Sequence, residues 1–156
     1  MIEVSTYIDV SPDAVWQLVG DPSRMGEWSP ECRRVRWLGR ASGPAVGARF
    51  KGYNRIGWRR WSTVGTVAAY EPGREVAWDV SVGPLAVARW SYRVEPTDTG
   101  CTLTESFVDQ RGPLIHTVGA AVRGVGDTET HNRAGMARTL ANIKAAAEAA
   151  RTAEAS

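Results

Sequence analysis

From about residue 31 to residue 108, the chain is a series of strand-like segments separated by short, turn-forming links. The six segments span residues 32–38, 47–56, 61–70, 75–82, 85–94 and 101–108. Their links contain turn formers such as Gly57, Pro72-Gly73 and Gly83-Pro84. Because parallel neighbours need a long crossover connection, links of this kind favour antiparallel pairing. The sequence therefore predicts an antiparallel meander.

One strand and two short helices are predicted before this meander. Residues 2–10 alternate between apolar and polar side chains, which indicates a strand with one buried face. The hydroxyl of Ser11 can then cap a helix, and Pro12 fits the first helical position because no N–H is needed there. Gly20 and Pro22 end this helix, and a second helical turn leads to Trp28.

A long helix is predicted over residues 127–151, with Asp127 or Thr128 as its N-terminal cap. Its apolar face carries Met136, Leu140, Ile143 and Ala147 at helical spacing. Between the meander and this helix, residues 114–125 have helical spacing interrupted by two glycines, so their structure stays open.

Length and charge narrow the classes of function. A chain of 156 residues predicts one domain over residues 1–156. A net charge of +2 gives no electrostatic case for nucleic acid, and we interpret Arg33-Arg34 and Arg59-Arg60 as solvated strand faces. No apolar run approaches the roughly 20 residues of a membrane span, and the first residues lack the pattern of a signal peptide. We therefore expect a cytoplasmic protein without stable membrane insertion.

The inventory of reactive residues is sparse. Cys32 and Cys101 match neither a disulfide framework nor a zinc spacing, and two histidines are too few for a histidine-based metal site. No phosphate-binding loop or nucleophile elbow is present, so we expect no metal and no cofactor. Leu and Ile together number only eleven, against seven Trp. Wide rings beside small residues either interlock or leave space, and both outcomes stay open.

Motifs spread over the whole chain carry a resemblance to a known family. They are Ser11-Pro12-x-x-Val15-Trp16, the segment from Asp21-Pro22 to Trp28-Ser29-Pro30, Val46-Gly47-x-x-Phe50-x-Gly52-x-Asn54, Trp61, Glu71-Pro72-Gly73 before Trp78, Trp90-Ser91-Tyr92, Gly100-Cys101-Thr102-Leu103-Thr104-Glu105 and Gly135-Met136-x-x-Thr139-Leu140. Together with the order of elements, they resemble the START-like superfamily, polyketide cyclase/dehydrase (SRPBCC) family. The resemblance implies an α+β helix-grip fold, in which a curved antiparallel sheet of about seven strands wraps around the long C-terminal helix. It specifies function poorly, because this superfamily holds cyclases, lipid carriers and hormone receptors.

In such a fold, strand alternation selects the side chains that face the C-terminal helix. We expect a ligand site formed by Phe50, Asn54, Trp61, Thr63, Trp78, Trp90, Tyr92, Glu105 and Phe107, with Met136 from the helix and, by resemblance, Trp28 near the mouth. Apolar walls with a few polar groups are typical of small-molecule sites. Gly52 and Gly65 take little room, so we expect the sheet to curve and leave space there.

Three of these residues have competing interpretations. An inward Glu105 is costly unless it is paired, so it is either an acid/base or ligand anchor, or the partner of an arginine, or a surface residue. Asn54 either contacts a ligand or satisfies a bulge. Trp28 is either a gate residue or a packing anchor for the short helices.

Two function classes follow. The first is binding of a hydrophobic small molecule, such as a lipid, polyketide or aromatic compound, between the sheet and the C-terminal helix. The alternative is a polyketide cyclase/aromatase-type enzyme with Glu105 as acid/base, Tyr92 as hydroxyl donor and Asn54 as carbonyl orienter. A partner-binding protein without a ligand has no positive sign in the sequence, and we expect a monomer or a homodimer.

Overall fold

The computed structural model describes residues 1–113, 115 and 121–156. It begins with β1 (Ile2–Ile8), α1 (Pro12–Val19), the 3-10 turn η1 (Pro22–Arg24) and α2 (Met25–Trp28). The following strands are β2 (Cys32–Trp37), β3 (Arg49–Ile56), β4 (Arg59–Glu71), β5 (Glu75–Val82), β6 (Leu85–Pro96) and β7 (Cys101–Asp109). The long helix α4 (Thr128–Glu154) comes last. This order of elements is the predicted α+β arrangement.

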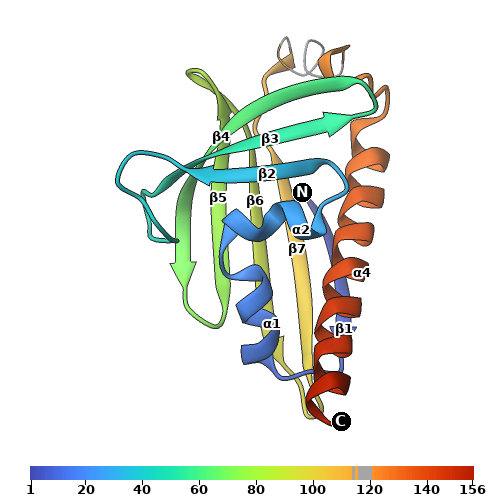
Figure 1. The fold of residues 1–156 in the computed structure, drawn as a ribbon. Helices are drawn as coiled ribbons and strands as arrows, with labels where there is room; N and C mark the ends of the chain where they lie inside the picture. Colours follow the sequence, from blue (N-terminus) through green and yellow to red (C-terminus); the bar gives the residue numbers. More distant parts are fainter. Residues whose placement is uncertain (114, 116–120) are drawn as a thin grey trace.

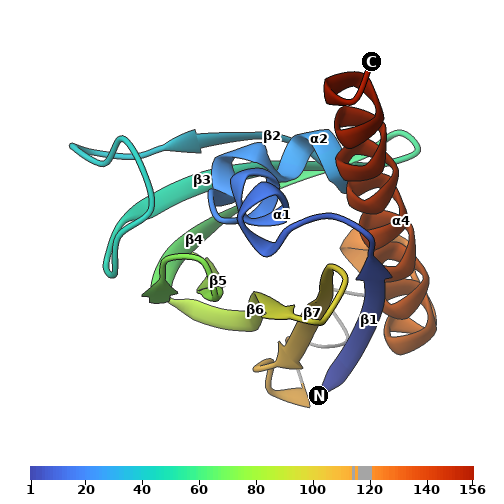
Figure 2. The same cartoon turned by 90° about the horizontal axis from the view of Figure 1, so that it is seen from below.

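All seven strands form one antiparallel sheet in the order β1-β7-β6-β5-β4-β3-β2. Strands β2 to β7 are therefore the predicted meander, and β1 closes the sheet by pairing with β7, with Ile2 opposite Phe107. Figure 1 shows α4 running beside β1 and β7, while β2 and β3 cross above them. Figure 2 shows the sheet as a curved trough, with α1 and α4 on its concave side. The chain thus has the helix-grip fold.

Local signals explain where the helices begin and end. Ser11 caps α1 by accepting a hydrogen bond from the Ala14 N–H at 3.3 Å, and the Gly20 N–H donates to the Trp16 carbonyl. Asp127 caps α4, because its carboxylate accepts the Thr130 N–H at 3.1 Å. The prediction for residues 114–125 lies mostly outside the described residues, although residues 121–123 are helical.

The core lies between the concave face of the sheet and the apolar face of α4. Met136, Leu140, Ile143 and Ala147 are all buried, as the helical spacing predicts. They are covered mainly by β1, and the same core includes Ile8, Val94 and Leu103. This packing holds the second half of α4 against the sheet, and the cavity described below lies beside its first half.

One expectation about space in the sheet is wrong. A Cβ atom at Gly65 would overlap the ring of Phe50, which is only 3% exposed and stacks edge-on with Trp37. Gly65 therefore makes room for an aromatic ring and leaves no void. At Gly52, by contrast, an added Cβ would meet only the Thr63 hydroxyl, at an ordinary 3.5 Å.

Candidate functional site

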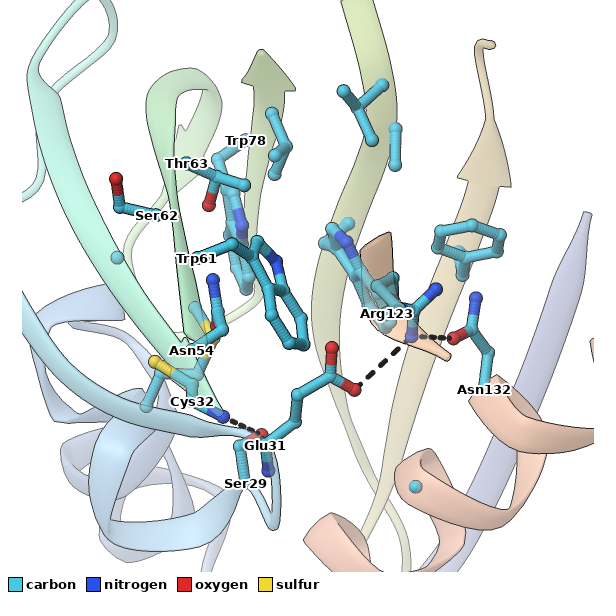
Figure 3. A pocket seen from close by; sticks show the side chains of 18 of the residues that line it. Ser29, Glu31, Cys32, Asn54, Trp61, Ser62, Thr63, Trp78, Arg123 and Asn132 are labelled. Carbon is cyan, nitrogen blue, oxygen red and sulfur yellow. Dashed lines mark hydrogen bonds and ion pairs between the residues drawn. The ribbon is translucent and has the colours of Figure 1, made fainter. Parts of the chain in front are cut away.

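A cavity of about 360 Å³ lies between the sheet and the first half of α4. Its volume falls within the range of about 300–1,000 Å³ that is common for small-molecule sites. Its walls are mostly apolar and include Met25, Val35, Phe50, Trp61, Trp78, Val80, Trp90, Phe107 and Met136. Figure 3 shows polar side chains around it, among them Asn54 and Thr63 from the sheet, Asn132 from α4 and Glu31 from the link before β2. The wide tryptophan rings therefore leave space between them.

Ten of the eleven residues expected at the ligand site line this cavity. They are Phe50, Asn54, Trp61, Thr63, Trp78, Trp90, Tyr92, Glu105, Phe107 and Met136. They converge because the antiparallel register places Trp78 opposite Trp90, and Trp90 in turn opposite Phe107. Their position is a structural finding, and their roles in binding stay predictions.

Trp28 is the exception, because it does not line the cavity. Its indole N–H donates to the Leu18 carbonyl at 3.1 Å, and the Arg24 guanidinium lies over its ring at 5.4 Å. The Trp28 carbonyl accepts a hydrogen bond from the Asn142 side chain of α4 at 2.8 Å. These contacts support the packing interpretation, in which Trp28 joins α1, α2 and α4, and a role of Trp28 in ligand binding stays a prediction.

Glu105 lies deep in the cavity wall and is only 6% exposed. It stands opposite Tyr92 in the β6–β7 ladder, and the Tyr92 hydroxyl donates to its Oε1 at 3.4 Å. Its other oxygen, Oε2, is buried without a hydrogen-bond partner among the described residues. Neither the surface position nor the arginine pair is therefore found within the described part of the chain.

Burial controls the chemistry of this pair. Removal from water raises the pKa of Glu105 to about 8, although the hydrogen bond from Tyr92 partly opposes this. Burial, with the neighbouring Glu105, also raises the pKa of Tyr92 well above its usual range. At neutral pH Glu105 is therefore mainly protonated. Because Oε1 accepts from Tyr92, Oε2 is the oxygen left to carry the proton and to donate it.

Sequence patterns do not predict the contacts of a polar cluster at one end of the cavity. Glu31 Oε2 lies 3.3 Å from Arg123 Nη2 and 3.3 Å from His131 Nε2, and Arg123 Nη2 donates to Asn132 Oδ1 at 3.0 Å. Figure 3 shows Glu31 and Asn132 meeting Arg123 from opposite sides. Asn132 lies near the start of α4 and is only 5% exposed.

Two hydrogen-bond donors of this cluster have no acceptor among the described residues. Arg123 Nε and Asn132 Nδ2 are buried without an acceptor in the described part of the chain. An arginine can only donate, so the oxygen of the Asn132 amide must face Arg123 and its NH₂ group must face away. The cluster therefore offers hydrogen-bond donors, whereas its one carboxylate is already engaged by Arg123 and His131.

Other chemistry is limited among the described residues. Cys32 lines the cavity, but burial raises the pKa of its thiol to about 11, so it is not a nucleophile at neutral pH. No three His, Cys, Asp or Glu side chains gather there in a way that could hold a metal ion. Within those residues, no helix has the length and apolar character needed to cross a bilayer.

A family model described as polyketide cyclase / dehydrase and lipid transport matches residues 1–148. The chain belongs to this polyketide cyclase/dehydrase and lipid transport family. A search of the curated proteins finds no match.

Solved structures agree with membership of the polyketide cyclase/dehydrase and lipid transport family. A polyketide-cyclase-like protein from Corynebacterium glutamicum is 32% identical, with a TM-score of 0.57 over 92% of this chain and 88% of that one. A di-domain ARO/CYC protein from the steffimycin biosynthetic pathway is 16% identical, with a TM-score of 0.73 over 97% of this chain and 51% of that one. Major latex-like protein 151 from Panax ginseng is 14% identical, with a TM-score of 0.69 over 92% and 94% of the two chains. The last two likenesses concern the fold alone.

Proposed function

We propose that this chain binds a hydrophobic small molecule, such as a lipid, a polyketide or an aromatic compound, in the cavity between the sheet and α4. The observation that carries the proposal is the buried Glu105 carboxyl, whose Oε2 has no partner among the described residues. Leaving such a group unpaired costs about 1–3 kcal/mol. A hydroxyl or carbonyl oxygen of a ligand would remove that cost by accepting the proton of Oε2.

The rest of the cavity supports an apolar ligand with few polar groups. Trp90 and Phe107 form one wall, with ring centroids 4.7 Å apart, and Trp78 lies next to Trp90 on the neighbouring strand. Burial of apolar area contributes roughly 25 cal/mol per Å² to binding. Contact between an apolar ligand and these aromatic rings would therefore supply most of the free energy of ligand binding. The polar groups then fix the orientation of the ligand. At one end they include Asn132 and Arg123, and on the sheet they include Glu105.

A cavity-filling substitution at Gly52 tests this proposal. The Gly52→Val side chain fits the strand and extends into the cavity, because an added Cβ has only the Thr63 hydroxyl beside it. We expect at least tenfold weaker binding of the apolar probe N-phenyl-1-naphthylamine, followed by its fluorescence, because the new methyl groups take its place. Lys51→Val, on the opposite face of β3, is the matched control and should bind the probe as the wild type does.

Two results would contradict the proposal. One is a wild-type protein that takes up neither this probe nor any member of a lipid and aromatic-compound screen read by native mass spectrometry. The other is equal weakening by Gly52→Val and Lys51→Val, which would place the probe outside the cavity.

The pKa of about 8 at Glu105 favours a second candidate function, a polyketide cyclase/aromatase-type enzyme. A carboxyl that titrates near neutral pH can both give and take a proton during a reaction. Tyr92 is its hydrogen-bond partner, and Asn54 lines the same cavity and would orient a carbonyl.

The substitution Glu105→Gln separates this function from binding alone. With a reactive poly-carbonyl chain as substrate, we expect the loss of turnover, because an amide cannot transfer the proton. Binding of N-phenyl-1-naphthylamine should change by less than about threefold, because the amide keeps the shape of the carboxyl. Glu95→Gln, at an exposed position of β6, is the control. Turnover that survives Glu105→Gln would show that the assignment is wrong.

A further inference from the structure

A strong separation of charge runs through the chain. Residues 32–70 carry nine of the 19 basic residues and none of the 17 acidic ones. The rest of the chain carries the other ten basic residues and all 17 acidic residues. This basic segment forms β2, β3 and β4. The small net charge of +2 therefore conceals one basic segment in an otherwise acidic chain.

Four exposed arginines gather where β3 and β4 meet the start of β2. Arg33, Arg34, Arg55 and Arg60 line one shallow depression, and Arg55 lies opposite Arg60 in the ladder. None of the four forms an ion pair with a carboxylate in the described part of the chain. Like charges side by side on a sheet destabilise it. An anionic surface from outside the chain would supply the missing counter-charge.

Apolar side chains are exposed around the opening of the cavity and in the β3–β4 turn. Val82, Leu85 and Val122 line the cavity, yet 50%, 46% and 49% of their surface is exposed, so they mark where the cavity meets solvent. Trp58, in the β3–β4 turn, is 81% exposed. The neighbouring Arg59 lies over its ring at 4.9 Å and donates to the Ala121 carbonyl at 2.6 Å, which ties this turn to residues 121–123.

The segments that carry the exposed apolar residues lie at one end of the molecule. Figure 1 shows the β3–β4 turn, the β5–β6 turn and the segment before α4 at its upper end. We call Trp58, Val82, Leu85 and Val122, together with Arg33, Arg34, Arg55 and Arg60, the mouth surface. It combines an apolar rim, an exposed tryptophan and guanidinium groups that have no carboxylate partner among the described residues.

We propose that the mouth surface docks on a bilayer that contains anionic phospholipids. The arginines pair with headgroup phosphates, Trp58 lies at the headgroup level, and the aliphatic rim faces the acyl chains. This inference rests on the proposed function: an apolar ligand then passes between the bilayer and the cavity without crossing water. A soluble polyanion would match the arginines, but it would leave the tryptophan and the rim exposed. The bilayer therefore accounts for both halves of the surface.

Co-sedimentation with vesicles tests this docking. We expect binding to phosphatidylcholine vesicles that contain about 30% phosphatidylglycerol, weak binding to pure phosphatidylcholine, and loss of binding at high salt. The double variant Arg55→Gln/Arg60→Gln should bind roughly 25-fold more weakly, at about fivefold for each arginine. Trp58→Ser should weaken binding about tenfold at unchanged charge.

Matched controls remove the same charge and the same kind of side chain elsewhere. Arg133→Gln/Arg138→Gln lies on the exposed face of α4, and Val46→Ser replaces a residue that is 68% exposed in the β2–β3 link. Both should bind anionic vesicles as the wild type does. All these variants lie outside the cavity lining, so each should still bind N-phenyl-1-naphthylamine.

The outcomes separate this inference from the proposed function. If the wild type binds the naphthylamine probe but sediments equally with neutral and anionic vesicles, the docking proposal is overturned and ligand binding stands. If the probe does not bind at all, the proposed function fails first. Equally tight binding to heparin, or competition by millimolar inorganic phosphate, together with no effect of Trp58→Ser, would assign the arginines to a soluble anion and overturn the bilayer.

Discussion

Glu105 shows how the surroundings of one side chain set its protonation. The usual pKa of 4.5 is raised to about 8 because burial disfavours the charged form. Between these two pH values the folded protein holds a proton that the unfolded chain releases, so stability falls as the pH rises. We expect the wild type to lose a few kcal/mol of unfolding free energy across this window relative to Glu105→Gln. Urea unfolding of both proteins at several pH values within it measures the difference.

The opposite sign would be equally informative. If the wild type became more stable than Glu105→Gln as the pH rises, Glu105 would be ionised in the fold and paired with a cation. Glu95→Gln serves again as the control, because an exposed glutamate contributes little to the pH dependence of folding.

At the scale of the element, α4 holds the trough closed through one apolar stripe. Leu140 is 1% exposed and belongs to the cluster that includes Ile8, Leu103 and Ile143. Leu140→Ala should lower the unfolding free energy by about 2–5 kcal/mol, because it removes buried methyl groups and leaves a void. Arg138→Ala, on the exposed face of the same helix, should change it by less than about 0.5 kcal/mol. Equal effects in chemical unfolding would mean that α4 does not pack through this stripe.

The same scale explains which parts of the site the sequence could predict. Strand alternation has a period of two, so the inward positions of Trp78, Trp90 and Glu105 follow as soon as the strands are recognised. Glu31 and Arg123 lie in connecting segments without a period, and only the packed chain brings them together. The sequence places Trp28 near the mouth by resemblance alone, whereas its contacts with Leu18 and Arg24 follow from the packing of this chain.

Void space is the other quantity that a pattern cannot supply. Gly52 and Gly65 face the same side of neighbouring strands, and sequence treats them alike. In the fold, Gly65 receives the Phe50 ring, whereas Gly52 borders the cavity. The difference depends on the direction that one ring takes, which follows from its contacts with Trp37 and Trp78.

For the molecule as a whole, the elements at the two ends of the chain meet. β1 lies between β7 and α4, and Lys144 of α4 donates to the Tyr7 carbonyl. Every other neighbouring pair of strands is consecutive in the sequence and pairs over a shorter separation along the chain. The trough can therefore take shape from β2 to β7, and β1 with α4 completes it.

The pairing of β1 with β7 has a consequence for synthesis on the ribosome. Ile8 cannot pair before Cys101, which lies more than ninety residues later in the chain, has been translated. At about 5–20 residues per second, this strand spends roughly 5–20 seconds unpaired. Its polar alternate positions Glu3 and Ser5 then reduce its tendency to pair with other nascent chains. The first strand translated is thus among the last to fold.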